Sequence, residues 1–181
     1  MQSADLSSSY FALFDLPVSF DVDRKILTER YRTLQRTVHP DRYADAADSE
    51  RRLSVQMAAR INEGYQTLKD PLARARYLLE ISGVVLDDLD TAFDNEFLME
   101  QMDLRERLGD VKKCADPQQQ LQEIADDISA RKKEITEAVA LLFVENTDEA
   151  LEKARNLTRK LQFFSRLEEE ADALDDDLSD Y

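Results

Sequence analysis

Apolar residues recur at helical spacing along almost the whole chain, and this periodicity is what most limits its possible folds. Leu27, Tyr31, Leu34 and Val38, for example, lie at i, i+4, i+7 and i+11, which places them on one face of a helix. The 181 residues include only 3 Gly and 4 Pro, so few positions interrupt such helices. The sequence therefore predicts an all-α protein.

Capping residues and prolines divide the first half of the chain into helical segments. Asp or Ser ahead of an apolar repeat is typical of a helix start, and proline keeps the residue before it out of the helical region. We expect a helical turn at 10–14, a helix capped by Asp21 or Asp23 that ends at Pro40, a helix that Ser49 opens, and one running from Asp70-Pro71 to Ser82-Gly83. The apolar stripe of the helix that Ser49 opens is Leu53, Met57, Ile61, Tyr65 and Leu68.

Residues 83–91 form a short connector between an expected first domain at 1–82 and a second domain at 92–181. Three longer helical patterns follow, from about Thr91 to Val111, from Asp116-Pro117 and from Thr147. Long amphipathic helices with short links are typical of a bundle, so we expect a C-terminal three-helix bundle with a frayed acidic tail. The apolar positions of its last two helices are Leu121, Ile124, Ile128, Ile135, Val139, Leu142, Leu157, Leu161, Phe164, Ala171 and Leu174.

Charge is distributed unevenly along the chain. The net charge is −15, which argues against binding to duplex DNA. Residues 1–76 hold 12 Lys and Arg against 11 Asp and Glu, whereas residues 77–181 hold 12 against 28. This asymmetry predicts two parts with different partners.

Cys114 is the only cysteine, which excludes an internal disulfide and a cysteine-based metal site. Residues 1–9 carry no positive charge and no long apolar core, so we expect no signal peptide. No apolar run approaches the roughly 20 residues of a membrane span. These features favour a protein of a reducing compartment that carries no metal and no cofactor and does not enter the membrane.

His39 is the only histidine, and it precedes Pro40 and Asp41 at the tip of the expected helical hairpin. A loop at such a tip is exposed, and proline reduces the entropy that the loop loses when a partner orders it. Asp41 offers a carboxylate to an arginine or a backbone N–H of that partner. We therefore interpret His39-Pro40-Asp41 as a recognition loop, although a lone histidine is more often structural.

The helix before this loop carries a basic stripe made of Lys25, Arg32 and Arg36. These residues lie at i, i+7 and i+11, on the side of the helix opposite its apolar residues. A solvated helix face is the simplest explanation of such a stripe. Beside a stiff tripeptide loop, however, the stripe could also steer the helix onto an acidic surface.

The first 76 residues resemble a J-domain in the order and spacing of four segments. The resemblance implies that this part of the chain contacts a DnaK-type chaperone and stimulates its ATP hydrolysis. It assigns that contact to His39, Pro40, Asp41, Lys25, Arg32 and Arg36. The four segments are Tyr10-Phe11-Ala12-Leu13-Phe14, the basic helix, His39-Pro40-Asp41, and the run from Ile61-Asn62-Glu63-Gly64-Tyr65 to Asp70-Pro71.

The helix expected at 91–111 has two apolar faces. One stripe, which we expect to face the bundle, consists of Phe93, Phe97, Leu104, Leu108 and Val111. A second group, Leu98, Met99 and Met102, lies a quarter to half a turn away among charged residues. It either contacts a further neighbour in the fold or forms an exposed, methionine-rich binding surface. Because the adjacent Phe163 and Phe164 cannot both enter the core, we expect Phe164 to pack and Phe163 to turn toward a flank.

Segments 71–79, 97–106 and 159–163 resemble the HscB-type co-chaperones, whose J-domain is followed by a helical domain. This resemblance implies delivery of an iron–sulfur cluster scaffold protein to a specialised, HscA-like chaperone of the DnaK type. Some members carry an N-terminal cysteine-rich metal site; its absence here indicates the bacterial type and a cytoplasmic location. The implied scaffold-binding residues are Leu98, Met99, Met102, Asp103, Arg105, Glu106 and Phe163.

The sequence is therefore consistent with three functions. The first is a monomeric adaptor without enzymatic activity, since the sequence holds no nucleotide loop, metal-ligand cluster or nucleophile–base pair. The second is a J-domain protein whose bundle binds another client or dimerises. The third, an enzyme with His39 as general base, is disfavoured because a loop tip offers no pocket for a substrate.

Overall fold

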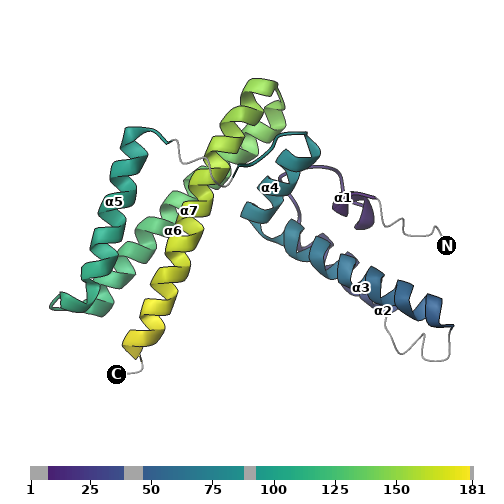
Figure 1. Cartoon of the computed structure of the whole chain (residues 1–181), viewed down its shortest axis with the longest axis horizontal. Coiled ribbons are helices and arrows are strands. Elements are labelled where there is room, and N and C mark those ends of the chain that lie inside the picture. Colours follow the sequence, from purple (N-terminus) through teal and green to yellow (C-terminus); the bar gives the residue numbers. More distant parts are fainter. Residues whose placement is uncertain (1–7, 39–46, 88–92, 180–181) are drawn as a thin grey trace. The chain divides into compact units, whose positions relative to one another are not determined.

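The computed structural model describes residues 8–38, 47–87 and 93–179, and every regular element within these ranges is helical (Figure 1). The expectation of an all-α protein is confirmed. The chain divides into two compact units, Met1–Ser82 and Gly83–Tyr181. None of the described helices is both long and apolar enough to cross a membrane.

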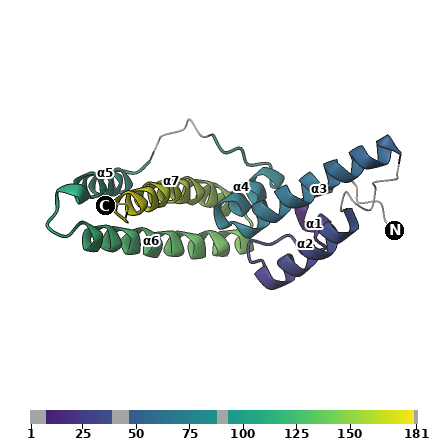
Figure 2. The ribbon, with the colours of Figure 1, turned by 90° about the horizontal axis from the view of Figure 1, so that it is seen from below.

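The first unit contains a helical hairpin with a short helix on either side. The hairpin helices α2 (Arg24–Val38) and α3 (Asp48–Lys69) lie side by side, and α1 (Tyr10–Leu13) and α4 (Pro71–Ile81) flank them (Figure 2). Of the two expected caps for α2, Asp23 is the one used: its Oδ1 accepts the N–H groups of Lys25 and Ile26 at 2.8 and 3.1 Å. Asp70 caps α4 as expected, with Pro71 at the first helical position.

The core of the first unit is formed by large apolar side chains from all four helices. The largest of them are at most 1% exposed: Phe11, Phe14, Leu27, Ile61, Leu68 and Leu79. The expected stripe of α3 is wrong at Leu53, which is 52% exposed, whereas Ser54 is 5% exposed. Leu53 lies about 60° from the centre of the buried arc on the helix, so it falls at the margin of the interface.

Helix α1 packs against α3 at Gly64, where there is no room for a side chain. A Cβ atom at this position would lie 2.8 Å from Tyr10 Cδ1 and 3.1 Å from Phe14 Cε2. The Tyr10 ring cannot easily move away, since it packs on Tyr77 at 4.7 Å between ring centroids and its backbone N–H donates to the Tyr77 hydroxyl. Burial, with an added contribution from Glu63, raises the pKa of Tyr10 to about 12.

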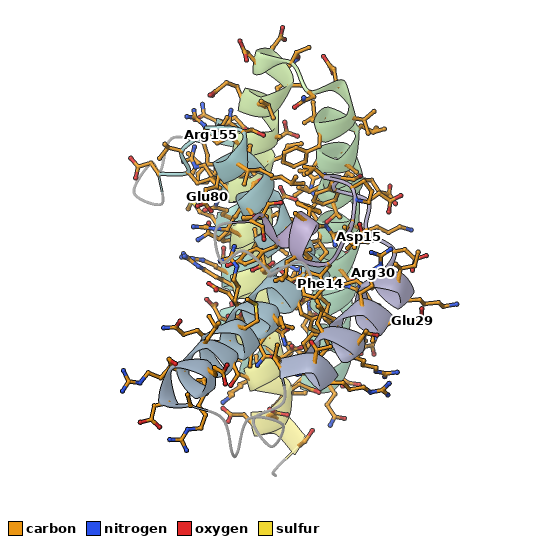
Figure 3. All side chains as sticks on the ribbon, turned by 90° about the vertical axis from the view of Figure 1, so that its right-hand side faces the viewer. Phe14, Asp15, Glu29, Arg30, Glu80 and Arg155 are labelled. Carbon is orange, nitrogen blue, oxygen red and sulfur yellow. The ribbon has the colours of Figure 1, made fainter. Side chains whose placement is uncertain are left out.

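Arg30 connects α2 to the segment that follows α1. Its Nη1 donates to the backbone carbonyls of Phe14 and Asp15, at 2.9 and 2.6 Å, and also pairs with the Asp15 carboxylate (Figure 3). Asp15 itself is in the left-handed region, with φ 50°. The arginine thereby donates hydrogen bonds to carbonyl groups at the C-terminal end of α1 and fixes this segment against α2.

The second unit contains α5 (Asn95–Asp110), a single 3₁₀ turn η2 (Val111–Lys113), α6 (Pro117–Glu145) and α7 (Asp148–Ser179). Helices α6 and α7 share the most extensive interface of the chain and run side by side in Figures 1 and 2. Asn146, with φ 49°, ends α6 in a left-handed cap, and the Thr147 hydroxyl accepts the Ala150 N–H. The starts expected at Asp116-Pro117 and Thr147 are confirmed.

Most of the expected bundle residues are buried in the second unit. Leu142, Leu157 and Leu174 are only half-buried. The expected frayed tail is wrong as far as Ser179, since α7 stays helical to that residue. Lys112 pairs with Asp177 at 3.2 Å, which connects this acidic end to the turn after α5. Of the positions expected to be buried in the last two helices, those exposed by 8% or less are Leu121, Ile124, Ile128, Ile135, Val139, Leu161, Phe164 and Ala171.

We predict that Gly64→Ala destabilises the protein by about 1–3 kcal/mol, because the added methyl group overpacks the contact with α1. Equilibrium unfolding in urea, followed by circular dichroism, measures the change. Gly109→Ala is the matched control, since nothing lies within 4 Å of a Cβ at that position. The control should gain about 0.5–1 kcal/mol from helix propensity. Equal stability of the two variants would contradict the close approach of α1 to α3.

Candidate functional surfaces

The tripeptide His39-Pro40-Asp41 lies outside the described residues, directly after the last residue of α2, Val38. Its role therefore remains the one that the J-domain resemblance implies. Helix α2 directly precedes the tripeptide in the chain.

Helix α2 presents its basic stripe to solvent. Lys25, Arg32 and Arg36 are all exposed. The opposite side of the helix faces α3, where the Tyr31 ring stacks on Tyr65 at 4.0 Å between centroids and Leu27 is fully buried. Apolar contacts thus orient the helix so that its three positive charges point away from the core.

Helix α5 has one buried and one exposed apolar face. Phe97, Leu104 and Leu108 are 2%, 5% and 8% exposed, and they pack toward α6 and α7. Met99 and Met102 are 73% and 72% exposed, and Leu98 is 38% exposed. The other helices of the bundle therefore do not cover this second face. Exposed apolar side chains within one helical turn mark a candidate binding surface.

The remaining candidate residues border these apolar side chains. Asp103, Arg105 and Glu106 are exposed on α5. Phe163 comes from α7 and is half-buried, while Phe164 is fully buried, as expected for this pair. The Arg105 guanidinium lies over the Phe163 ring at 5.5 Å, which joins the α7 residue to the edge of the α5 residues. We call this set of seven residues the α5 surface: Leu98, Met99, Met102, Asp103, Arg105, Glu106 and Phe163.

Ion pairs across the bundle hold α5 in position. Arg131 of α6 donates from Nε and Nη2 to the two carboxylate oxygens of Glu100, at 2.7 and 3.3 Å, and from Nη1 to Glu134. The hydrogen bond to Glu100, followed by the one to Glu134, raises the pKa of Arg131. Nearer the end of α5, Arg107 pairs with Asp127 at 2.8 Å. Sequence reasoning missed these pairs, since their members are 31 and 20 residues apart.

The start of α5 differs from the expected helix at 91–111. The helix begins at Asn95, and Asp94 caps it by accepting the Phe97 N–H at 2.8 Å. Phe93 lies before the helix, where its ring packs under the Arg159 guanidinium at 4.4 Å. Asp94 also pairs with Lys160 at 2.5 Å, and this hydrogen bond is the main reason why the pKa of Asp94 is lowered. The Asp94 cap thus makes the helix begin after Phe93, although the apolar spacing continues through Phe93.

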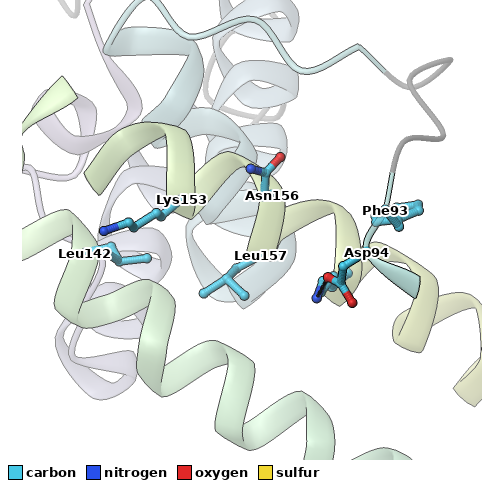
Figure 4. A pocket seen from close by; sticks show the side chains of 7 residues that line it. Phe93, Asp94, Leu142, Lys153, Asn156 and Leu157 are labelled. Carbon is cyan, nitrogen blue, oxygen red and sulfur yellow. Dashed lines mark hydrogen bonds and ion pairs between the residues drawn. The ribbon is translucent and has the colours of Figure 1, made fainter. Parts of the chain in front are cut away.

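A groove of about 520 Å³ lies between the start of α5 and the paired helices α6 and α7 (Figure 4). Phe93, Leu142 and Leu157 give it an apolar lining, and Lys153 and Lys160 border it. Both lysines already pair with carboxylates of this chain, Lys153 with Glu149 and Lys160 with Asp94. The groove is therefore poorly suited to an anionic ligand, and its neighbouring ion pair contributes to anchoring α5.

Comparisons with known proteins identify the family of this chain. Residues 93–172 match the family model described as the HSCB C-terminal oligomerisation domain. A co-chaperone protein HscB homolog of Shewanella sp. strain MR-4 is 40% identical over 173 residues, which covers 95% of this chain and 99% of the relative. The chain belongs to the HscB family of co-chaperones. A relative from Shewanella pealeana, with the same description, is 42% identical over 173 residues.

Solved structures of HscB proteins have the same fold. HscB from Vibrio cholerae aligns with a TM-score of 0.85 at 38% identity, covering 94% of this chain and 99% of that one. The human HscB co-chaperone aligns with a TM-score of 0.88 at 32% identity, covering 97% and 86%. Yeast Jac1, at 20% identity and a TM-score of 0.68, supports the fold alone. The expected succession of a J-domain and a C-terminal helical domain is confirmed.

We predict that Arg131→Met loosens the attachment of α5 without unfolding the bundle. The variant removes both contacts to Glu100, and because the arginine side chain is 40% exposed the loss should be only about 0.5–1 kcal/mol. Amide hydrogen exchange in α5, read by mass spectrometry, should become faster. Lys133→Met is the control, since Lys133 makes only an exposed 4.0 Å pair with Glu137 within α6. Unchanged exchange in α5 of Arg131→Met would show that the apolar stripe alone holds the helix.

Proposed function

We propose that this chain is an adaptor with two separate binding surfaces, one for a chaperone ATPase and one for the protein that the chaperone acts on. As a member of the HscB family, it works with an Hsp70-type chaperone in iron–sulfur cluster assembly. The observation that carries the proposal is the exposure of Leu98, Met99 and Met102 on a helix whose opposite face is buried.

The first surface consists of the basic face of α2 and the tripeptide that follows it. Lys25, Arg32 and Arg36 lie on one exposed helix face, so they can approach an acidic surface together. His39-Pro40-Asp41 then contacts the ATPase of a specialised, HscA-like chaperone of the DnaK type. The charges steer the encounter and the tripeptide acts on the bound ATPase.

The α5 surface binds the iron–sulfur cluster scaffold protein. Exposed methionine side chains adapt to the shape of a partner, and an aromatic ring at the edge supplies rigid contact area. Asp103, Arg105 and Glu106 surround these groups with charges of both signs, which fix the orientation of the partner. This arrangement of an apolar centre and a charged border is typical of a protein–protein interface.

The chain has no catalytic role of its own in this proposal, since ATP is hydrolysed by the chaperone. Holding the scaffold protein and the ATPase on one polypeptide raises their effective concentration toward one another. The adaptor acts as a monomer in the bacterial cytoplasm, without a metal or a cofactor.

We predict that His39→Gln abolishes the stimulation of the partner chaperone. The substitution removes the imidazole while keeping a polar side chain of similar length, so the loss reports on the recognition loop. Steady-state ATP hydrolysis by the purified HscA-like chaperone is the measurement, and binding of the scaffold protein, measured in parallel, should not change. Stimulation equal to that of the wild type would contradict the assignment of this loop to the contact with the chaperone.

A second prediction concerns Leu98→Ala combined with Met102→Ala. The double variant should bind the scaffold protein at least about tenfold more weakly, since truncating residues at the centre of an interface has the largest effect. Isothermal calorimetry measures the affinity, and the circular dichroism spectrum should be unchanged. Leu141→Ala with Val144→Ala is the matched control: these α6 residues are 72% and 83% exposed and lie outside the α5 surface. Equal affinities of the two double variants would contradict the proposed site.

The alternative is that the α5 surface joins two copies of the chain, or binds another client. The family model over residues 93–172 is described as an oligomerisation domain, which favours a test of self-association. Light scattering of the wild-type protein should give the mass of a monomer, 20.9 kDa. A dimer that becomes monomeric in the Leu98→Ala, Met102→Ala variant would instead support the alternative.

A further inference from the structure

The methionines that the structure describes fall into two very different environments. Met57 lies in the core of the first unit and is 8% exposed. Met99 and Met102 are 73% and 72% exposed, and they lie three residues apart on α5, within one helical turn. Among the described residues, the exposed thioethers therefore occur together at the apolar centre of the α5 surface.

An exposed thioether is a target for oxidation by a peroxide. The sulfur gives two electrons to the peroxide, the O–O bond breaks, and one oxygen atom becomes the sulfoxide oxygen while the other leaves as water when the oxidant is hydrogen peroxide. The product is polar, and the two methionine sulfoxide reductases convert its two epimers back to the thioether. Access of the oxidant to the sulfur decides which methionine reacts first.

We infer that Met99 and Met102 form a reversible oxidation site that weakens binding of the scaffold protein. The inference rests on the proposed function of the α5 surface. A sulfoxide on either side chain is hydrated in the free protein but must lose water when a partner covers it. An oxygen atom without a matching donor in the interface opposes binding, because burial of an unpaired polar group is unfavourable.

The fold should tolerate this modification, since α5 is attached by other residues. Its buried stripe, Phe97, Leu104 and Leu108, lies on the side opposite Met99. The Glu100–Arg131 pair also involves neither sulfur. In the first unit, the core shields Met57, so the part of the chain that acts on the chaperone keeps its thioether. Oxidation should therefore weaken binding of the scaffold protein and leave the contact with the chaperone intact.

Cys114 has to be removed before the effect of the methionines can be measured. Its thiol is exposed, at the end of the turn that follows α5, and peroxides oxidise exposed thiols as well. All proteins in the experiment therefore carry Cys114→Ala.

The first measurement locates the oxidation. The full-length protein is treated with hydrogen peroxide, digested, and analysed by peptide mass spectrometry. Met99 and Met102 should gain one oxygen each well before Met57, and bound scaffold protein should slow their reaction. Oxidation of Met57 at the same rate as Met99 and Met102 would overturn the inference.

The second measurement is calorimetry with the scaffold protein before and after peroxide. Oxidation of both sulfurs should weaken binding about tenfold or more, and treatment with both sulfoxide reductases and a thiol reductant should restore it. Met99→Leu with Met102→Leu is the control, since leucine fills a similar volume and carries no sulfur. Whatever the affinity of this variant before peroxide, peroxide should leave that affinity unchanged. If the leucine variant does not bind the scaffold protein, the parent protein provides the test. Binding that returns after treatment with the reductases supports the inference, and binding that does not return overturns it.

The remaining outcomes distinguish the inference from the function on which it rests. No binding before peroxide overturns the proposed function of the α5 surface, and the inference with it. Binding that persists after both sulfurs are oxidised overturns the inference and leaves the proposed function standing. Stimulation of the chaperone ATPase, measured without scaffold protein, should be the same before and after oxidation.

Discussion

The burial of one apolar stripe on α5 is the contact on which the position of this helix, and with it the α5 surface, depends. Phe97, Leu104 and Leu108 are almost completely buried, and full burial of such a side chain stabilises a fold by about 1.5–3 kcal/mol. The partly exposed ion pairs at Glu100 and Arg107 contribute about 1 kcal/mol or less each. Apolar packing therefore attaches the helix and fixes which of its faces reaches solvent, and the ion pairs add to that attachment.

Much of this fold could be predicted from the sequence because helices follow local rules. Spacing predicted the buried positions of α6 except at Leu142, which is only half-buried, and the caps at Asp70 and Asp116 were correctly placed. The adjacent Phe163 and Phe164 were correctly separated into a half-buried and a buried ring, since neighbours on a helix point in different directions.

The errors arise where tertiary contacts or polar groups override the spacing. The apolar pattern continues through Phe93, but the Asp94 side chain caps the helix after it, and Phe93 packs on Arg159 instead. Leu53 has the spacing of a core residue but lies at the margin of the buried arc. The Glu100–Arg131 pair joins residues 31 positions apart, a distance over which a single sequence gives no signal. The exposure of Met99 and Met102 likewise depends on how α5 docks. From the spacing alone, these side chains could either contact a further neighbour in the fold or form an exposed surface.

The link between α6 and α7 has a consequence for the order of folding. Asn146 and Thr147 alone connect the two longest helices, so their extensive interface is assembled by two consecutive helices that meet across a tight turn. Such local contacts form quickly, whereas α5 has to dock onto a surface that the hairpin has already created. We expect the hairpin to be the stable nucleus of this unit and α5 to be the element that joins last and opens first. The helix with the exposed methionines is then the part of the unit whose position can change while the rest stays folded.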